Sequence, residues 1–206
     1  MSQIKLKHSG GNSVIIAAPD SNPASDRTLK LPSDGDGTIL TTNSATGKIL
    51  QVVSTTKTDT ASQNNVGLGD FWNLTSIFKV DITPASASNK ILISGHVVFQ
   101  HDGNEAFYLA LYRDNSIYAA ANGNVVGSRL GVMSAGFSAH SWDQATCVIN
   151  FLDTSLGNTN QKSYSVGLAS STGSDRTMYL NRTYSDGGNA QTGRFQSTIT
   201  AMEIAA

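Results

Sequence analysis

The sequence predicts an all-β protein, and three observations lead to that prediction. Apolar and polar residues alternate with a period of two in several segments, which is the pattern of strands that turn one face to a core. Turn-forming Gly, Asn, Asp and Ser residues separate these segments, and no segment carries a sustained apolar stripe at helical spacing. Charged residues make up only 14% of the 206 residues, which does not fit a charged helical bundle.

From Lys48 onward the predicted strands are long and contain aromatic residues. In the segment 90–99, Ile91, Ile93 and Phe99 fall on one face. The same alternation predicts strands at 105–113, 146–152, 164–168 and 197–204.

A two-residue turn supports the antiparallel arrangement of these strands. Asp114-Asn115 separates two short β-like runs and predicts a tight hairpin between them. Roughly eight to ten strands with such turns predict an antiparallel β-sandwich, jelly-roll-like, that spans residues 49–206.

Residues 1–48 differ from the rest and are expected to form a separate attachment or stalk region. They contain no aromatic residue but hold three of the four prolines, and their apolar runs at 13–17, 28–31 and 38–42 are short. Such runs cannot bury a core within one copy, because their edges and apolar faces need a cover. We therefore expect this region to intertwine with identical chains in a homotrimer.

Composition argues against two classes of partner. The net charge is −1 and the Lys and Arg residues are scattered, whereas binding to nucleic acid needs clustered cations. No apolar stretch approaches the length of a membrane span, so we expect no membrane insertion. The first residues lack the charged and apolar regions of a signal peptide, and no export signal is expected.

Catalysis is not expected. Glycan hydrolysis needs two carboxyl groups at a set separation, one of them in an apolar setting. Glutamate occurs only at Glu105 and Glu203, and the carboxylates worth weighing are Asp102 with Glu105, and Asp143 beside Trp142. No nucleophile motif accompanies the histidines. We predict that the protein is not an enzyme and has no catalytic residue, with glycan degradation as the least favoured alternative.

No cofactor and no metal site is predicted. Asp34-Gly35-Asp36-Gly37 shares two aspartates with calcium loops but lacks the third ligand and the distant glutamate, so it is interpreted as a turn. His96 lies outward on its strand, and a metal held by three copies of it on a symmetry axis is kept as a minor alternative. Cys147 is the only cysteine and is expected to be a buried thiol among apolar neighbours.

Three loops are the candidate binding region. They combine aromatic rings with Asn, Asp, Gln and Arg, which suits the recognition of sugar hydroxyls and sugar faces, although ordinary solvated loops share this composition. The residues predicted to contact a receptor or glycan are His101, Asp102, Glu105, Trp142, Arg182, Tyr184, Asn189 and Arg194.

Several segments resemble a known group of proteins. They are 1–12, 18–23, Thr28-Leu29-Lys30-Leu31-Pro32, Gly37-Thr38-Ile39-Leu40-Thr41-Thr42, 47–54, 82–92 and 199–204. These segments are similar to virion fibre proteins of marine tailed phages, in particular those that infect cyanobacteria. Residues 101–195 match that group only in the rhythm of their strands.

This resemblance implies a homotrimeric virion protein that is made in the cytoplasm of the host bacterium. It implies that the N-terminal region mounts on the particle by binding other virion proteins, and that the β-sandwich lies outermost, where it contacts a host-surface glycan or protein. We expect a tail-fibre subunit; the alternatives are a capsid fibre, a decoration protein or a tail connector without receptor binding. The trimer interface is predicted at Tyr108, Tyr112 and Val98.

Overall fold

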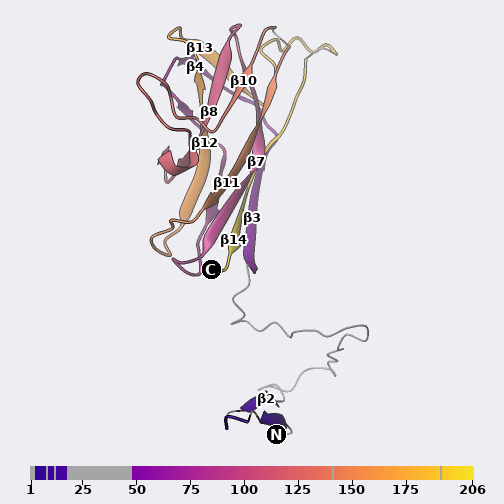
Figure 1. Cartoon of the computed structure of the whole chain (residues 1–206). Coiled ribbons are helices and arrows are strands. Elements are labelled where there is room, and N and C mark those ends of the chain that lie inside the picture. Colours follow the sequence, from indigo (N-terminus) through magenta and orange to yellow (C-terminus); the bar gives the residue numbers. More distant parts are fainter. Residues whose placement is uncertain (1–2, 8, 12, 18–47, 141, 191) are drawn as a thin grey trace. The chain divides into compact units, whose positions relative to one another are not determined.

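The computed structural model describes residues 3–7, 9–11, 13–17, 48–140, 142–190 and 192–206. The chain divides into two compact units, Met1–Ser44 and Ala45–Ala206. In the first unit, β1 (Gln3–Lys7) and β2 (Ser13–Ala17) form an antiparallel hairpin (Figure 1). The strand predicted at 13–17 is confirmed, whereas β1 was not predicted. The runs 28–31 and 38–42, with the turn at 34–37, lie outside the described residues.

The second unit consists of two antiparallel sheets, so the predicted all-β sandwich is confirmed. One sheet contains β3 (Ile49–Lys57), β4 (Ala61–Val66), β7 (Lys90–His101), β11 (Ala145–Asp153), β13 (Arg176–Leu180) and β14 (Ser197–Ile204). The other contains β5 (Trp72–Asn73), β6 (Lys79–Ile82), β8 (Ala106–Arg113), β9 (Ser116–Ile117), β10 (Ser134–Phe137) and β12 (Lys162–Ser170). One short 3₁₀ turn, η1 (Ala119–Ala121), follows β9.

The strand order is that of a jelly roll. In four cases two consecutive strands share one position in a sheet, which we call a line, because both pair with the same neighbouring strand or the same neighbouring line. These are β3 with β4, β5 with β6, β9 with β10, and β13 with β14. One sheet then runs β3/β4, β13/β14, β7, β11, and the other runs β5/β6, β12, β8, β9/β10. The first line thus lies beside the last and the second beside the next-to-last, as in a double Greek key.

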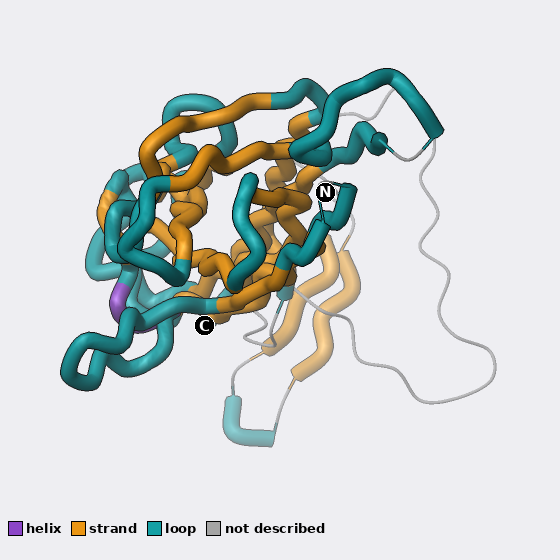
Figure 2. Tube along the Cα trace, turned by 90° about the horizontal axis from the view of Figure 1, so that it is seen from above, coloured by secondary structure: helices purple, strands orange, loops and turns teal. Residues whose placement is uncertain are grey.

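The core lies between the two sheets, whose strands are seen end-on in Figure 2. The faces predicted from alternation are those that the structure buries, because Ile91, Ile93 and Phe99 of β7 are all 0% exposed. Phe107 of β8 is equally buried and packs against Phe99 with ring centroids 4.6 Å apart. Cys147 is buried, as predicted, and burial raises the pKa of its thiol.

The predicted hairpin at Asp114-Asn115 is confirmed. Arg113 pairs with Ser116, and the two residues between them have φ angles of 52° and 66°. Positive φ at both central positions defines the type I′ turn, whose twist matches that of the strands it joins. The Asp114 carboxylate also accepts a hydrogen bond from the Ser163 amide at 3.0 Å, which fastens the turn to the start of β12.

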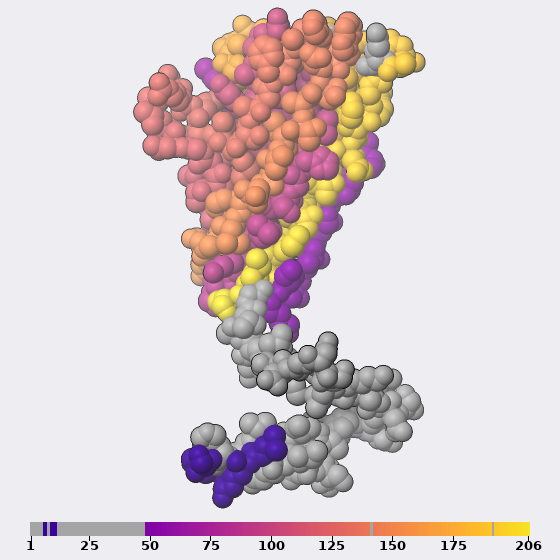
Figure 3. Space-filling view, turned by 45° about the vertical axis from the view of Figure 1, so that its right-hand side comes forward, coloured from indigo at the N-terminus to yellow at the C-terminus, as the bar shows by residue number. Residues whose placement is uncertain are grey.

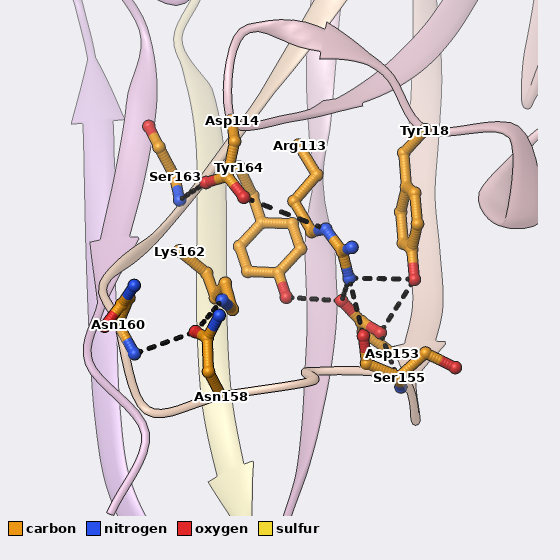
Figure 4. A network of polar contacts seen from close by, with 10 residues as sticks. All are labelled: Arg113, Asp114, Tyr118, Asp153, Ser155, Asn158, Asn160, Lys162, Ser163 and Tyr164. Atoms are coloured by element: carbon orange, nitrogen blue, oxygen red, sulfur yellow. Dashed lines mark hydrogen bonds and ion pairs between the residues drawn. The ribbon is translucent and has the colours of Figure 1, made fainter. Parts of the chain in front are cut away.

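A buried carboxylate ties β11 to β8, β12 and the loop after β9 (Figure 4). Asp153 is 0% exposed and accepts hydrogen bonds from Tyr164 Oη at 2.6 Å, Arg113 Nη1 at 2.8 Å and Tyr118 Oη at 2.9 Å, with a further bond from the Ser155 amide. Burial works to raise the pKa of Asp153, but these hydrogen bonds outweigh it and the pKa lies below its ordinary value. The network was not predicted from the sequence.

Candidate functional site

Two of the three loops predicted to bind a ligand lie at the same end of the sandwich because of the strand pairing. Ala145 pairs with Phe99, and Phe137 pairs with Ala106. The end of β7 therefore adjoins the start of β11, and the β7–β8 and β10–β11 loops meet.

Gln100 joins these loops to the third one, the connection between β13 and β14. Its side chain is 0% exposed, and its amide nitrogen donates to the His140 carbonyl at 2.6 Å and to Ser138 Oγ at 3.1 Å. Its amide oxygen accepts the Tyr184 backbone N–H at 2.6 Å. One buried amide thus holds two loops that lie about forty and eighty residues away along the chain. Both its nitrogen and its oxygen have hydrogen-bond partners, as buried polar groups in folded proteins usually do.

A surface cavity of about 160 Å³ lies between the three loops. It is lined by His101, Asp102, Gly103, Asn104, Ala139, His140 and Tyr184. Three of the predicted contact residues, His101, Asp102 and Tyr184, therefore line one cavity. The cavity and these loops are the candidate functional site.

His101 shapes the β7–β8 loop from within. It is 1% exposed, and its Nδ1 accepts the Gly103 N–H at 2.8 Å. The proton of the neutral ring therefore lies on Nε2, which donates to the Glu105 carbonyl at 3.1 Å. Burial is the main cause that lowers the pKa of His101, which favours this neutral form. His101 is thus a rigid wall of the cavity.

The carboxylates that were weighed for catalysis are bound to their own chain. Asp102 Oδ1 accepts the Thr177 N–H at 3.1 Å, and Glu105 forms an ion pair with Arg176. The Arg176 hydrogen bond lowers the pKa of Glu105, whereas a general acid needs a raised pKa. Glu105 does not line the cavity. The remaining glutamate, Glu203, is buried and accepts hydrogen bonds from Asn89 Nδ2 at 2.6 Å and from Ala85 N–H at 2.7 Å.

Two exposed aromatic residues stand near the cavity. Trp142 is 48% exposed, and its ring stacks on that of His140 with centroids 5.8 Å apart and an interplanar angle of 16°. Tyr184 is 45% exposed and contacts the ring of Tyr179, with centroids 5.6 Å apart. About half of each residue is exposed to solvent, and an exposed aromatic ring can stack on the face of a sugar.

Arg182, Arg194 and Asp186 form a cluster in the β13–β14 connection. The Arg182 guanidinium lies 4.2 Å from the centroid of the Tyr179 ring and 3.8 Å from the Asp186 carboxylate. Arg194 pairs with both Asp186 oxygens, one of them at 2.9 Å. The two predicted arginines therefore order this loop and do not line the cavity. Asn189 is exposed, and its carbonyl accepts the Thr192 N–H at 3.1 Å.

Three residues that line or support the cavity were not predicted: Gln100, His140 and Tyr179. Gln100 carries a signal, since it is a polar residue that directly follows the apolar run 97–99 inside a strand. Nothing in the local sequence marks His140 and Tyr179, because their role depends on which aromatic rings the fold brings beside them.

The residues predicted at a trimer interface are largely covered by their own chain. Val98 is 6% exposed, Tyr112 is 7% exposed and Tyr108 is half-buried. Tyr112 lies over Gly167, where an added Cβ would come within 2.4 Å of its ring, and meets Phe71 edge-on at 6.5 Å. Burial, with a smaller contribution from the Asp70 charge, raises the pKa of Tyr112.

A different surface carries exposed apolar side chains of the sheet that contains β3, β7, β11 and β14. Leu152, Leu92, Met202 and Val52 lie in one row across β11, β7, β14 and β3, and Leu152 and Val52 are 41% and 56% exposed. The rows beside it are Asn150, Ser94, Thr200 and Ser54, and then Val148, His96, Thr198 and Thr56. We call these three rows the outer face. They contain no Asp, Glu, Lys or Arg.

The described ranges contain neither a group of metal ligands nor a membrane-spanning helix. They hold no group of three or more His, Cys, Asp or Glu residues that could bind a metal. His96 Nε2 lies 3.1 Å from the Gln196 carbonyl of its own chain. Among the helices of this part of the chain, none is long and apolar enough to cross a membrane.

Fold and site define a jelly-roll sandwich with a loop-built cavity at one end. No family model and no curated protein matches the sequence. Solved structures of infectious bursal disease virus are distantly similar. The Gx strain shows 15% identity over 94% of this chain and 46% of that chain, with a TM-score of 0.39. The VP2 subviral particle shows 12% identity over 94% and 50%, with a TM-score of 0.38.

The Gt strain gives a comparable match, with 13% identity over 95% of this chain and 48% of that chain and a TM-score of 0.36. The chain spans about half the length of these matched chains. Neither the identity nor the structural overlap is high enough to transfer a role to this protein.

Proposed function

We propose that this protein is a structural subunit of a virion, a homotrimeric tail-fibre protein without catalytic activity. Residues 1–48 mount the trimer on the particle through other virion proteins, and residues 49–206 associate and contact the host surface. The resemblance of segments at both ends and in the middle of the chain to phage fibre proteins supports this role. A jelly roll is compatible with it, since viral capsid and lectin domains use this architecture, although a fold by itself does not select a function.

The observation that carries the proposal is the outer face, on the sheet that contains β3, β7, β11 and β14. In Figure 3, β3 (purple), β14 (yellow), β7 (magenta) and β11 (orange) lie side by side on the visible surface. The apolar row that includes the exposed Val52 and Leu152 crosses these four strands. Exposed apolar side chains that gather in one row favour a contact with another protein over an open solvent face.

The chemistry of the outer face fits a second copy of the same chain. An uncharged surface has no like charges to repel its own copy and needs no complementary charge. Four of its five hydroxyl groups bond within the chain, Ser54 with Thr200 at 2.8 Å and Thr56 with Thr198 at 3.1 Å. They therefore stay satisfied when the apolar row is covered. This face replaces Tyr108, Tyr112 and Val98 in the proposed interface.

Light scattering after size-exclusion chromatography tests the assembly. We expect a mass of three times the 21.7 kDa of one chain for the wild type. Val52→Glu combined with Leu152→Glu places charge in the apolar row and should give a monomer with an unchanged circular dichroism spectrum.

Val125→Glu is the matched control, because Val125 is 67% exposed but lies outside the outer face. It should leave the mass unchanged. A wild type that runs as a stable monomer would contradict the proposed trimer. A trimer that persists in the double variant would instead contradict the location of its interface.

A further inference from the structure

We propose that a second cavity, at the open side of the sandwich, binds a neutral pyranose sugar. The cavity has a volume of about 190 Å³ and lies where β4 and β5 come together. These strands are the outermost lines of the two sheets on this side. The lining residues are Gln63, Asn64, Asn65, Val66, Asp70, Phe71, Trp72 and Asn73.

A β-bulge places two consecutive amides at this cavity. Val66 pairs with Arg176 and Gln63 with Met178, so Asn64 and Asn65 together oppose the single residue Thr177. In a regular strand, neighbouring side chains point to opposite faces. The bulge, with the left-handed φ of 59° at Asn65, allows both amides to line one cavity.

The polar groups of the cavity have unused hydrogen-bonding capacity. The side chains of Asn65 and Asp70 have no hydrogen bond or ion pair within the described part of the chain. Asn64 uses its oxygen to accept from Thr177 Oγ1 at 3.1 Å, which leaves its amide N–H groups to a ligand. Amide donors beside a carboxylate acceptor match sugar hydroxyls, each of which both donates and accepts.

One amide of the cavity has a structural role instead. Asn73 Oδ1 accepts from the Thr75 amide at 2.9 Å and Thr75 Oγ1 at 2.7 Å, and its Nδ2 donates to Asn115 Oδ1 at 2.7 Å. Its hydrogen-bonding groups are therefore engaged by the protein, and it holds the wall in place.

Two half-buried aromatic residues give the cavity an apolar wall. Trp72 packs against the core, and Phe71 meets the ring of Tyr112 edge-on with centroids 6.5 Å apart. Anchored rings offer a preformed surface for the C–H groups of a sugar ring at little entropic cost. The negative charge of Asp70 disfavours phosphorylated and acidic ligands, which leaves a neutral sugar as the best match.

The proposed sugar site is independent of the proposed function. It shares no lining residue with the cavity at the β7–β8 loop and no residue with the outer face. Its success or failure therefore leaves the assembly experiment untouched.

Tryptophan fluorescence tests the proposal directly, because the chain has only two tryptophans. Trp142→Phe leaves Trp72 as the only tryptophan, so that excitation selective for tryptophan reports on this site alone. We would titrate this variant with the methyl glycosides of glucose, galactose, mannose and N-acetylglucosamine. We expect a saturable change in Trp72 emission with at least one of them, at a Kd on the order of 1 mM.

Two further variants in the Trp142→Phe background assign the signal. Asp70→Ala and Asn65→Gly should each weaken binding about tenfold, and glycine keeps the left-handed backbone at residue 65. Asp175→Ala removes an exposed carboxylate that does not line the cavity and should leave the Kd unchanged. No saturable change with any of the four sugars, or an unchanged Kd in both cavity variants, would overturn the proposal.

Discussion

At the scale of single residues, this protein depends on a few buried polar groups whose hydrogen bonds are satisfied. Gln100 joins three loops, and Asp153 joins three strands and a loop. A buried polar group without partners destabilises a fold by about 1–3 kcal/mol. Such residues therefore favour the one arrangement of strands and loops in which their hydrogen bonds form.

The first prediction concerns Asp153. Asp153→Asn removes the charge that accepts from Arg113, Tyr118 and Tyr164, and it leaves the guanidinium without its buried counter-ion. We expect the free energy of unfolding, measured with urea, to fall by about 3 kcal/mol at neutral pH. Asp175→Asn, at an exposed carboxylate, is the control and should leave it unchanged.

The same variant carries a prediction for pH. Asp153 has a folded pKa below its ordinary value of 3.8, so its stabilising effect is complete above that value and is lost as the pH falls through the folded pKa. The stability difference between wild type and Asp153→Asn should therefore shrink as the pH drops below about 4. A difference that stays constant to pH 2 would show that ionisation of Asp153 contributes nothing.

At the scale of elements, the central strand β7 shows how closely the sheet packs. β7 pairs with β11 on one edge and with β13 and β14 on the other. Gly95 lies opposite Ile149 and Ile199, and a Cβ at this position would come within 2.0 Å of the Thr198 carbonyl oxygen. A glycine inside a strand often marks such a close approach of two backbones.

Gly95→Ala should therefore destabilise the protein, because the methyl group forces β7 away from β14. We expect a loss of about 3 kcal/mol in thermal or urea unfolding. Gly173→Ala is the control, since its Cβ would meet nothing within 4 Å and its φ is not in the left-handed region. Equal stabilities of the two variants would contradict the close backbone contact.

Some strands and turns could be predicted from the local sequence, and others could not. The hairpin at Asp114-Asn115, the strand at 197–204 and the buried face of β7 were predicted from neighbouring residues alone. β1 was not predicted, although Ile4 and Leu6 alternate with lysines along it. Tyr112 and Val98 alternate with core residues along their strands, but Phe71 meets the Tyr112 ring edge-on and Ser197 Oγ accepts the Val98 N–H. Alternation assigns a face and does not reveal what lies on it.

At the scale of the whole molecule, the proposed subunit has two surfaces with separate tasks. The outer face contains no Asp, Glu, Lys or Arg, which suits association, whereas the loop end is aromatic and polar, which suits contact with a ligand. Because the two surfaces share no residue, a variant in one should leave the other intact.

Binding of the fluorescently labelled trimer to host cells tests this separation. Trp142→Ala with Tyr184→Ala should reduce bound protein at least tenfold, since the two exposed rings are the proposed contact anchors, while the trimer mass stays unchanged. Phe137→Ala is the control, because Phe137 is a 60% exposed ring outside the cavity. Undiminished binding of the double variant would favour a decoration or connector protein without host contact at this site.

The sequence by itself determined the all-β class, the faces of the main strands, the tight hairpin at Asp114-Asn115 and the buried thiol of Cys147. These features follow from the side-chain period and from turn chemistry, which depend on residues a few positions apart. Only the tertiary structure decided the jelly-roll order, the cavity held by Gln100, the Asp153 network and the location of the exposed apolar row. Each of these joins residues far apart in the chain, and their proximity depends on strand order and register across two sheets.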